Sequence, residues 1–330
     1  MSAPLRALLA GRWEVAERDA WLQALTHACA GVTWSTEAEP GETIDVAVVA
    51  NPPPGCLQGL RGLRLVQSLW AGVDRLLADD TLPDEVPVAR MVDPAMTQAM
   101  AETALWATLS LHRGFFGYAR QQQAGQWLQH AQRRAEECAV VVLGYGEMGR
   151  AVAARLADAG YPVTAWTARP RGSPPHAGAA HPDAPGHEAG SRLRLVTGAQ
   201  ALEPVLAHAK VLLNLLPLTP ATRGLIDARL LAALPRGASV VNLARGAHVV
   251  EADLLAALDS GHLAHAVLDV FAVEPLPAVH RFWHHPGVTV LPHVAALTDL
   301  RSAAAVVADN LQRLAEGRPL VHLVDRDRGY

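Results

Sequence analysis

A run of apolar residues that ends in a glycine-rich turn constrains this chain more than any other feature. Residues 139–143 (AVVVL) have the composition of a buried strand, and residues 144–149 (GYGEMG) match the pattern G-x-G-x-x-G. A helical pattern follows at residues 150–159. Strand, glycine turn and helix in this order form the context in which the pattern binds a dinucleotide. We therefore expect a Rossmann-type unit to begin here.

Each glycine of the turn meets a separate physical demand. Gly144 permits a tight turn, Gly146 lets the backbone approach a pyrophosphate, and Gly149 allows the helix to pack closely on the strand. The helix N-terminus offers free N–H groups and a partial positive charge to phosphates. The predicted cofactor-binding residues of this turn are Gly144, Gly146, Glu147, Met148 and Gly149. The alternative is a glycine-rich turn without a ligand.

The end of the next predicted strand, residues 163–166, indicates which dinucleotide binds. In NAD-binding units an Asp or Glu lies about 20 residues past the glycines and binds the ribose hydroxyls. This chain instead has Thr167, followed by Arg169 and Arg171. A carboxylate would repel a 2′-phosphate, whereas Thr and Arg can donate hydrogen bonds to one. The sequence therefore favours NADP(H), with NAD(H) as the alternative cofactor; otherwise both arginines are simply solvated.

Short apolar runs alternate with helical patterns along the chain, which is typical of parallel sheets covered by helices. Further strands are expected at residues 5–9, 44–50, 63–69, 86–91, 211–216, 239–243, 265–270 and 288–291. Helices are expected at residues 14–29, 97–112, 227–234, 251–258 and 300–316. Because one core rarely grows to 330 residues, two domains are expected, and the last helix should return to pack on the first.

Composition and charge exclude several classes of protein. Half of the residues are hydrophobic, 18% are charged and the net charge is −4, which fits a globular fold without a basic nucleic-acid surface. The sequence contains no apolar run of the roughly 18 to 20 residues that span a membrane. Its start lacks the apolar core of a signal peptide. Cys29, Cys56 and Cys138 form no CxxC pair. We expect a soluble protein of the reducing cytoplasm, with no membrane partner.

Residues 170–192 differ from the rest of the chain. They are rich in Pro, Gly, Ala and His and have no apolar periodicity, which predicts a surface loop. The spacing of His176, His181 and His187 matches no common zinc-ligand pattern, so we predict no metal site.

Polar residues follow three consecutive predicted strands of the second domain. Arg245 follows the first, Asp269 and Glu274 follow the second, and His293 follows the third. The carboxyl ends of parallel strands meet at one edge of a sheet, where open α/β sheets bind their ligands. These residues are therefore expected to share one site.

These residue types suit the reduction of a 2-oxo acid. The forked guanidinium of Arg245 can bind the substrate carboxylate. His293 can donate a proton to the carbonyl oxygen near neutral pH, and a carboxylate such as Glu274 would orient and favour the imidazolium. Each residue alone has a purely structural explanation, such as an ion pair. Their conjunction after a dinucleotide turn predicts an oxidoreductase.

Long strings of the chain resemble the D-isomer-specific 2-hydroxyacid dehydrogenases over nearly its whole length. The matching strings are LGYGEMG, NLLPLTPATRGLID, NLARGAHVVEADLLAAL, LDVFAVEPLP and LPHVAALT. WHHPGVTVLPHVAALT and the C-terminal VDRDRGY are most similar to the glyoxylate/hydroxypyruvate reductase A group of that family.

The resemblance implies an α/β fold of two Rossmann-like domains with a cleft between them. A flavodoxin-like substrate domain would comprise residues 1–100 and 297–330. A doubly wound NAD(P)-binding domain, which includes a dimerisation arm, would comprise residues 101–296. The implied assembly is a homodimer, and the implied activity is NADPH-preferring reduction of glyoxylate and hydroxypyruvate to D-2-hydroxy acids.

The resemblance also assigns roles to residues. It gives substrate binding to Arg245, acid–base chemistry to His293 and the support of His293 to Glu274. The loop that holds the substrate carboxylate would contain Trp70, Ala71, Gly72 and Val73. Residues beside the cofactor would be Leu216, Pro217, Leu218, Thr222, Ala244 and Asp269, the last at the nicotinamide end. Trp127 matches the dimerisation arm, from which it could reach the partner's site; core packing is the alternative role for Trp70.

Two alternatives to this activity stay open. The same chemistry could act on another, larger or aromatic, 2-oxo acid. A nicotinamide-sensing regulator without catalysis is the second alternative, since some relatives act as corepressors. The presence of Arg245, Glu274 and His293 together favours catalysis.

Overall fold

The chain folds into two compact α/β units, each built on its own sheet. The computed structural model describes residues 4–168 and 192–330. Unit 1 comprises Met1–Met96 and Thr298–Tyr330, and unit 2 comprises Thr97–Leu297. The predicted fold class, α/β with two Rossmann-like units, is confirmed. Among the described residues, no helix is long and apolar enough to cross a membrane.

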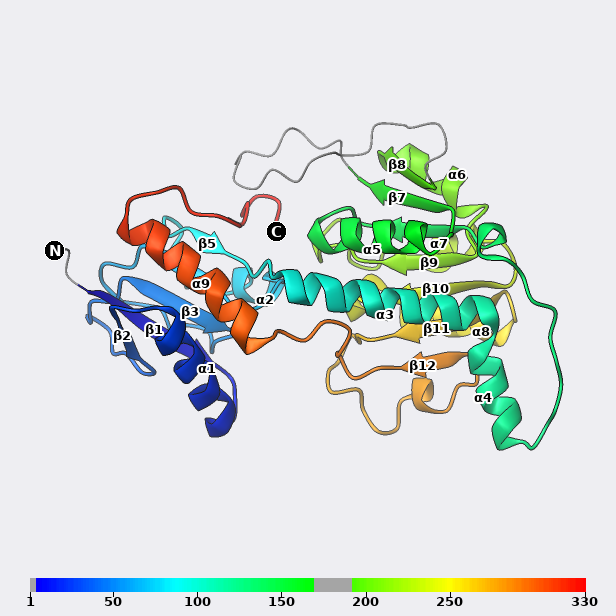
Figure 1. The fold of residues 1–330 in the computed structure, drawn as a ribbon, viewed down its shortest axis with the longest axis horizontal. Coiled ribbons are helices and arrows are strands. Elements are labelled where there is room, and N and C mark those ends of the chain that lie inside the picture. Colours follow the sequence, from blue (N-terminus) through cyan, green and yellow to red (C-terminus); the bar gives the residue numbers. More distant parts are fainter. Residues whose placement is uncertain (1–3, 169–191) are drawn as a thin grey trace. The chain divides into compact units, whose positions relative to one another are not determined.

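Unit 1 is a parallel sheet with the strand order β2-β1-β3-β4-β5, the flavodoxin-like order. Its strands are β1 (Leu5–Gly11), β2 (Val32–Ser35), β3 (Val46–Ala50), β4 (Leu65–Ser68) and β5 (Val88–Ala89). Its helices are α1 (Val15–Ala28), α2 (Asp74–Leu77) and α9 (Leu300–Ala315). Helix α9 packs against α1, as expected for the last helix, although nearly the whole sequence separates the two (Figure 1).

Unit 2 is a doubly wound parallel sheet with the order β12-β11-β10-β9-β6-β7-β8. Its strands are β6 (Val140–Leu143), β7 (Val163–Thr167), β8 (Leu193–Thr197), β9 (Val211–Asn214), β10 (Ala238–Asn242), β11 (Leu263–Leu268) and β12 (Val288–Val290). The α-helices associated with it are α3 (Pro94–Arg113), α4 (Phe115–Gln123), α5 (Glu147–Asp158), α6 (Leu202–Leu206), α7 (Ala228–Ala232) and α8 (Glu251–Asp259). Short 3-10 turns are Ala135–Glu137, Ala199–Ala201, Gly246–His248 and Arg281–Trp283.

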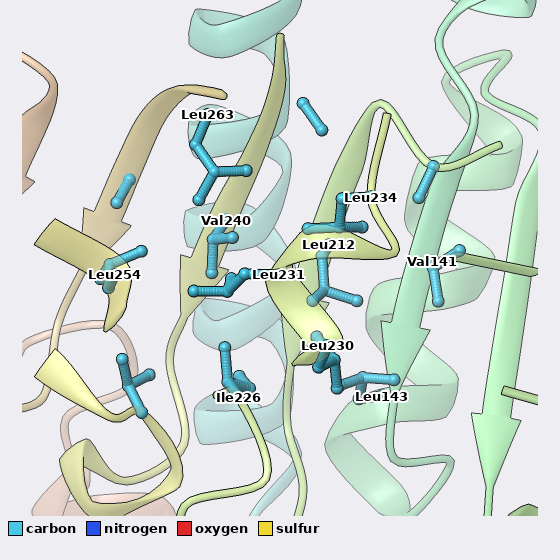
Figure 2. Packing of buried hydrophobic residues seen from close by; sticks show 14 of the residues in the cluster. Val141, Leu143, Leu212, Ile226, Leu230, Leu231, Leu234, Val240, Leu254 and Leu263 are labelled. Atoms are coloured by element: carbon cyan, nitrogen blue, oxygen red, sulfur yellow. The ribbon is translucent and has the colours of Figure 1, made fainter. Parts of the chain in front are cut away.

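Strand β6, in the middle of the sheet of unit 2, is apolar throughout because helices cover both faces of the sheet there. Val141 and Leu143 pack in one cluster with leucines of α7 and α8, as Figure 2 shows for one part of it. Val140 and Val142 point to the opposite face and join a cluster with residues of α3 and α5. Alternate residues of β6 therefore pack into two different hydrophobic cores, which explains the continuous apolar run AVVVL.

The sheet of unit 2 reverses its order between β6 and β9. Strands β7 and β8 extend the sheet on one side of β6, and β9 to β12 extend it on the other. Loops that leave neighbouring strands at such a point diverge, and open α/β sheets bind ligands in the crevice between them. This geometry places the glycine turn after β6 and the loop after β9 at the expected ligand site.

Several boundaries differ from the prediction. Helix α5 begins at Glu147, inside the glycine pattern, rather than at residue 150. Strands β2 and β8 were not predicted, and both lie at sheet edges where most of their residues stay partly exposed, so neither forms a strong apolar run. The predicted surface loop 170–192 lies outside the described residues except for its last residue.

Candidate active site

The glycine turn after β6 has the geometry that the sequence predicts. Gly144 has a φ of +98°, and a Cβ there would lie 2.7 Å from the carbonyl oxygen of Leu215. A Cβ on Gly149 would overlap the carbonyl oxygen of Gly144. Neither position tolerates a side chain, because the atoms that a Cβ would meet belong to the backbone.

Gly146 differs from its neighbours because nothing lies within 4 Å of the point where its Cβ would stand. It precedes α5 as N-cap, and no side chain caps the helix there. The first N–H groups of a helix have no partner within the helix, so this end is suited to an anion. The carboxylate of Glu147 pairs with Arg150, which offsets the negative charge that Glu147 brings to this position.

The loop after β9 lies against the glycine turn. The N–H of Leu215 donates to the carbonyl of Leu143 at 2.8 Å. Thr222 then fixes the loop, since its Oγ1 donates to the carbonyl of Pro217 at 2.7 Å and accepts from the N–H of Thr219 at 2.9 Å. Leu216, Pro217, Leu218 and Thr222, all predicted cofactor contacts, thus belong to one ordered segment at the switch point.

Thr167 is the last residue of β7, and its carbonyl accepts from the N–H of Gly198 at 3.0 Å. The indole of Trp166 donates to the carbonyl of Gly198 at 2.9 Å. An open pocket lined by residues 197–201 lies beside this strand end. Arg169 and Arg171, predicted to bind a 2′-phosphate, lie outside the described residues.

Arg245, Asp269 and His293 leave three neighbouring strands at one edge of the sheet. Asn242 of β10 is in register with Leu268 of β11, which is in register with Val290 of β12. The loops that follow are bonded to one another: the N–H of Asp269 donates to the carbonyl of Asn242 at 3.0 Å, and the N–H of His293 donates to that of Asp269 at 2.9 Å.

Glu274 and His293 form a direct pair. Nδ1 of His293 lies 2.9 Å from Oε2 of Glu274, while Oε1 of Glu274 accepts from the N–H of Phe271 at 3.0 Å. The carboxylate is 22% exposed and the imidazole 51%. A carboxylate held by the backbone at one oxygen fixes the ring with the other, which leaves Nε2 of His293 for a reacting group.

His293 has a backbone conformation that is unusual for its residue type. Its φ is +57°, in the left-handed region that non-glycine residues seldom occupy. Asp269 holds this conformation, because its two carboxylate oxygens accept from the N–H groups of Val294 at 2.7 Å and Ala295 at 3.1 Å. Such strain persists where surrounding bonds over-determine it, often at functional positions.

The carboxylate of Asp269 is itself in a constrained environment. The residue is 1% exposed, and burial raises its pKa, while the two backbone hydrogen bonds act in the opposite direction. Both oxygens are engaged with the backbone that follows His293, an arrangement that the sequence did not predict.

Arg245 lies in a turn that is packed on the loop carrying Glu274. Its Nη1 donates to the carbonyl of Ala244 at 2.8 Å. A Cβ on the next residue, Gly246, would overlap the backbone of Phe271 and Ala272. Because Phe271 is also the donor to Glu274, the turn with Arg245 and the pair with His293 form one continuous set of contacts.

The predicted carboxylate-binding loop belongs to unit 1. It follows β4, and Ser68 closes it by accepting from the N–H of Trp70 at 3.0 Å and donating to its carbonyl at 3.1 Å. Trp70, Ala71 and Gly72 are half-buried, and Val73 is buried.

Three buried polar residues at the candidate site, Asn214, Asn242 and His248, were given no role from the sequence. Each asparagine ends a strand, and the two side chains bond to each other at 2.9 Å. The signal was available, since an amide that ends an apolar strand run needs a buried partner. For metals, the described part of the chain brings no three His, Cys, Asp or Glu side chains into a cluster that could hold an ion.

Comparison with known proteins places this geometry in a family. Residues 105–295 match the family described as D-isomer specific 2-hydroxyacid dehydrogenase, NAD binding domain. A glyoxylate/hydroxypyruvate reductase A of Klebsiella pneumoniae (strain 342) is 40% identical over 299 residues, 89% of this chain and 90% of the relative.

Solved structures agree with the match. A D-isomer specific 2-hydroxyacid dehydrogenase from Xanthobacter autotrophicus Py2, in complex with NADPH and MES, has a TM-score of 0.87 at 38% identity and covers 100% of both chains. An NADPH-dependent glyoxylate/hydroxypyruvate reductase from Sinorhizobium meliloti, in complex with NADP and sulfate, has a TM-score of 0.86 at 33% identity, over 99% of this chain and 100% of that one.

Proposed function

The chain belongs to the D-isomer specific 2-hydroxyacid dehydrogenases, and from this premise we propose that it is an NADPH-preferring reductase of glyoxylate and hydroxypyruvate. The observation that carries the proposal is the pair formed by His293 and Glu274 beside the turn of Arg245, on the same sheet as the glycine turn. The products would be D-2-hydroxy acids. The activity of the Klebsiella relative supports this substrate class.

The cofactor would be held by the glycine turn and the loop after β9. The open backbone at Gly146 and the free N-terminus of α5 suit its pyrophosphate. We assign Leu216, Pro217, Leu218, Thr222, Ala244 and Asp269 to its remaining contacts. When bound, the reduced nicotinamide supplies a hydride to the carbonyl carbon of the substrate.

Side chains of the protein bind the substrate and supply the proton that the reduction needs. Arg245 binds the substrate carboxylate, and its fork orients the carbonyl group. Imidazolium His293 donates the proton on Nε2 to the carbonyl oxygen as this oxygen gains charge, and Glu274 stabilises the cation at Nδ1 until then. We also assign the backbone of Ala71, Gly72 and Val73 to the substrate carboxylate, with Trp70 beside it.

The preference for NADPH is supported by the end of β7. Thr167 stands where a ribose-binding carboxylate would repel a 2′-phosphate, and the Xanthobacter and Sinorhizobium relatives were solved with NADPH and NADP. Replacing Arg169 or Arg171 with alanine should raise the Kd of NADPH by about 10-fold, on the scale of one lost charge-assisted hydrogen bond, and leave that of NADH nearly unchanged. Fluorescence titration of both cofactors measures this. Equal effects on the two cofactors would exclude a phosphate contact.

The activity is tested by mixing the purified protein with NADPH or NADH and a panel of 2-oxo acids. We expect the absorbance of the reduced nicotinamide to fall fastest with NADPH and glyoxylate or hydroxypyruvate. A faster loss with a larger or aromatic acid would keep the chemistry and replace the substrate. Cofactor binding without turnover on any acid would favour a sensing role instead.

We assign unit 1 as the substrate domain and unit 2 as the NAD(P)-binding domain with its dimerisation arm. A homodimer is supported by exposed apolar side chains on α3, α4 and the segment after α4. They are Trp106, Leu109, Phe115, Trp127 and Leu128. We place the protein in the cytoplasm because its three cysteines are free thiols.

A further inference from the structure

We propose that His248 is a positioning residue that couples the nucleotide-binding loop after β9 to Arg245. The inference rests on the proposed function, since that function assigns the loop to the cofactor and Arg245 to the substrate. His248 lies in the 3-10 turn Gly246–His248, directly after Arg245, and is 1% exposed.

The ring of His248 spans two backbone carbonyls. Nδ1 lies 3.1 Å from the carbonyl oxygen of Arg245, and Nε2 lies 3.2 Å from that of Pro217. A neutral ring donates to one of these oxygens and packs against the other, whereas an imidazolium donates to both and so joins the two carbonyls directly. A buried ring with contacts at both nitrogens cannot turn without losing both.

The backbone joins the same two segments. The N–H of Gly224 donates to the carbonyl of Ala247 at 2.9 Å, and the N–H of Ile226 donates to that of His248, also at 2.9 Å. Residues 224–226 continue the loop that Thr222 closes on Pro217. Displacement of the loop after β9 is therefore passed to the turn that follows Arg245.

A buried amide pair makes a second connection. The N–H of Leu216 donates to Oδ1 of Asn214 at 3.2 Å, Nδ2 of Asn214 donates to Oδ1 of Asn242, and Nδ2 of Asn242 donates to the carbonyl of Arg245 at 2.9 Å. Both asparagines end strands in the core, so their replacement would test folding as much as coupling. His248 is the member of the network whose role can be tested with the strands left intact.

The consequence is a coupling between two ligands. When a nucleotide binds, it fixes the position of the loop after β9, which in turn holds Arg245 where it binds a carboxylate. By thermodynamic linkage, a bound carboxylate must increase the affinity for the nucleotide by the same factor. Direct contact between substrate and nicotinamide would give coupling without His248. The probe is therefore ADP-ribose 2′-phosphate, which carries the pyrophosphate but no nicotinamide ring.

The experiment measures the Kd of oxalate, a carboxylate analogue of glyoxylate, by calorimetry with and without this nucleotide. In the wild-type protein we expect the nucleotide to tighten oxalate binding by about 5-fold, at the lower end of typical couplings. In His248→Leu this factor should fall to about 1, and in His248→Gln, which keeps an N–H donor, it should be intermediate. A merely structural role would lower the melting temperature and leave the factor unchanged.

The matched control is His262→Leu. His262 also contacts a backbone carbonyl, that of Leu231 at 3.0 Å, but it precedes β11 and so lies at the opposite edge of the sheet from Arg245. This variant should keep the wild-type factor. The coupling role would be overturned if the nucleotide did not tighten oxalate binding in the wild type, or if it tightened binding in both His248 variants as much as in the wild type. Turnover of glyoxylate in the same protein would still support the proposed function. Wild-type protein that neither binds oxalate nor turns over any 2-oxo acid would remove the proposed function itself.

Discussion

Replacing His293 with alanine should lower kcat for glyoxylate by about 10³-fold, within the range for loss of a general acid. The imidazole is the group held by Glu274 at 2.9 Å, and it is half exposed with Nε2 left for a reacting group. Without it, the oxygen that gains charge during hydride transfer has to take its proton from water. Stopped-flow or steady-state rates with NADPH measure the effect.

Cofactor binding should survive this change. The glycine turn and the loop after β9 leave other strands of the sheet, so the Kd of NADPH should stay within about 2-fold, the size expected for a surface substitution. His284→Ala is the matched control, because His284 is an exposed histidine of the loop before β12. Glu274→Gln should lose less activity than His293→Ala, since the acid remains but its imidazolium form loses a carboxylate partner. Near-normal turnover by His293→Ala would assign the proton to another group.

Replacing Gly246 with alanine should lower kcat/KM by about 10²-fold or more, although the change adds only one methyl group. Its Cβ would overlap the carbonyl carbon and oxygen of Phe271 and the nitrogen of Ala272. These are backbone atoms, so no side-chain rotation relieves the clash. A misplacement of about 1 Å at a catalytic group costs a factor of this size.

The displaced segment contains Phe271, which helps to position the proposed general acid, His293. Phe271 donates its N–H to Glu274, and Glu274 holds His293, so a shift of Phe271 loosens the pair while the turn of Arg245 moves on the other side. Gly117→Ala in α4 is the control, because the nearest atom to its added Cβ would be a side-chain nitrogen of Arg120 at 3.9 Å. We expect Gly246→Ala to lose about 1 to 3 kcal/mol of unfolding free energy, a cost typical of overpacking. Unchanged kinetics in Gly246→Ala would show that Arg245 and Glu274 act independently.

The central strands could be predicted because strands that are buried on both faces consist of continuous apolar residues. Residues 139–143 are apolar on both faces, since α3 and α5 cover one side of β6 and α7 and α8 cover the other. Edge strands have a weaker apolar pattern in the sequence. Strand β8, Leu193–Thr197, pairs on one side only and keeps its residues partly or fully exposed, so its pattern did not stand out from a loop.

The chemistry-bearing residues of the candidate site could be named in advance, but their supports could not. Glu274 and His293 are 19 positions apart, and their pairing was expected from their residue types, their places after neighbouring strands and the family resemblance. The bonds from Asp269 to the N–H groups of Val294 and Ala295 depend on a left-handed φ at His293, which no periodicity indicates. The contact of His248 with Pro217 joins positions 31 residues apart through a fold-dependent approach of two loops.

By itself the sequence determined the residue types, the two periodicities and the glycine turn, because these follow from local backbone geometry and from which faces are buried. It thereby specified parallel α/β sheets, a nucleotide turn and an Arg, Glu and His at strand ends. Only the tertiary structure decided how these groups are held: the overlap that forbids a side chain at Gly246, the carboxylate of Asp269 on the turn of His293, and the ring of His248 between two loops. Such contacts join atoms that are distant along the chain, and their distances are set by how strands pair and loops pack.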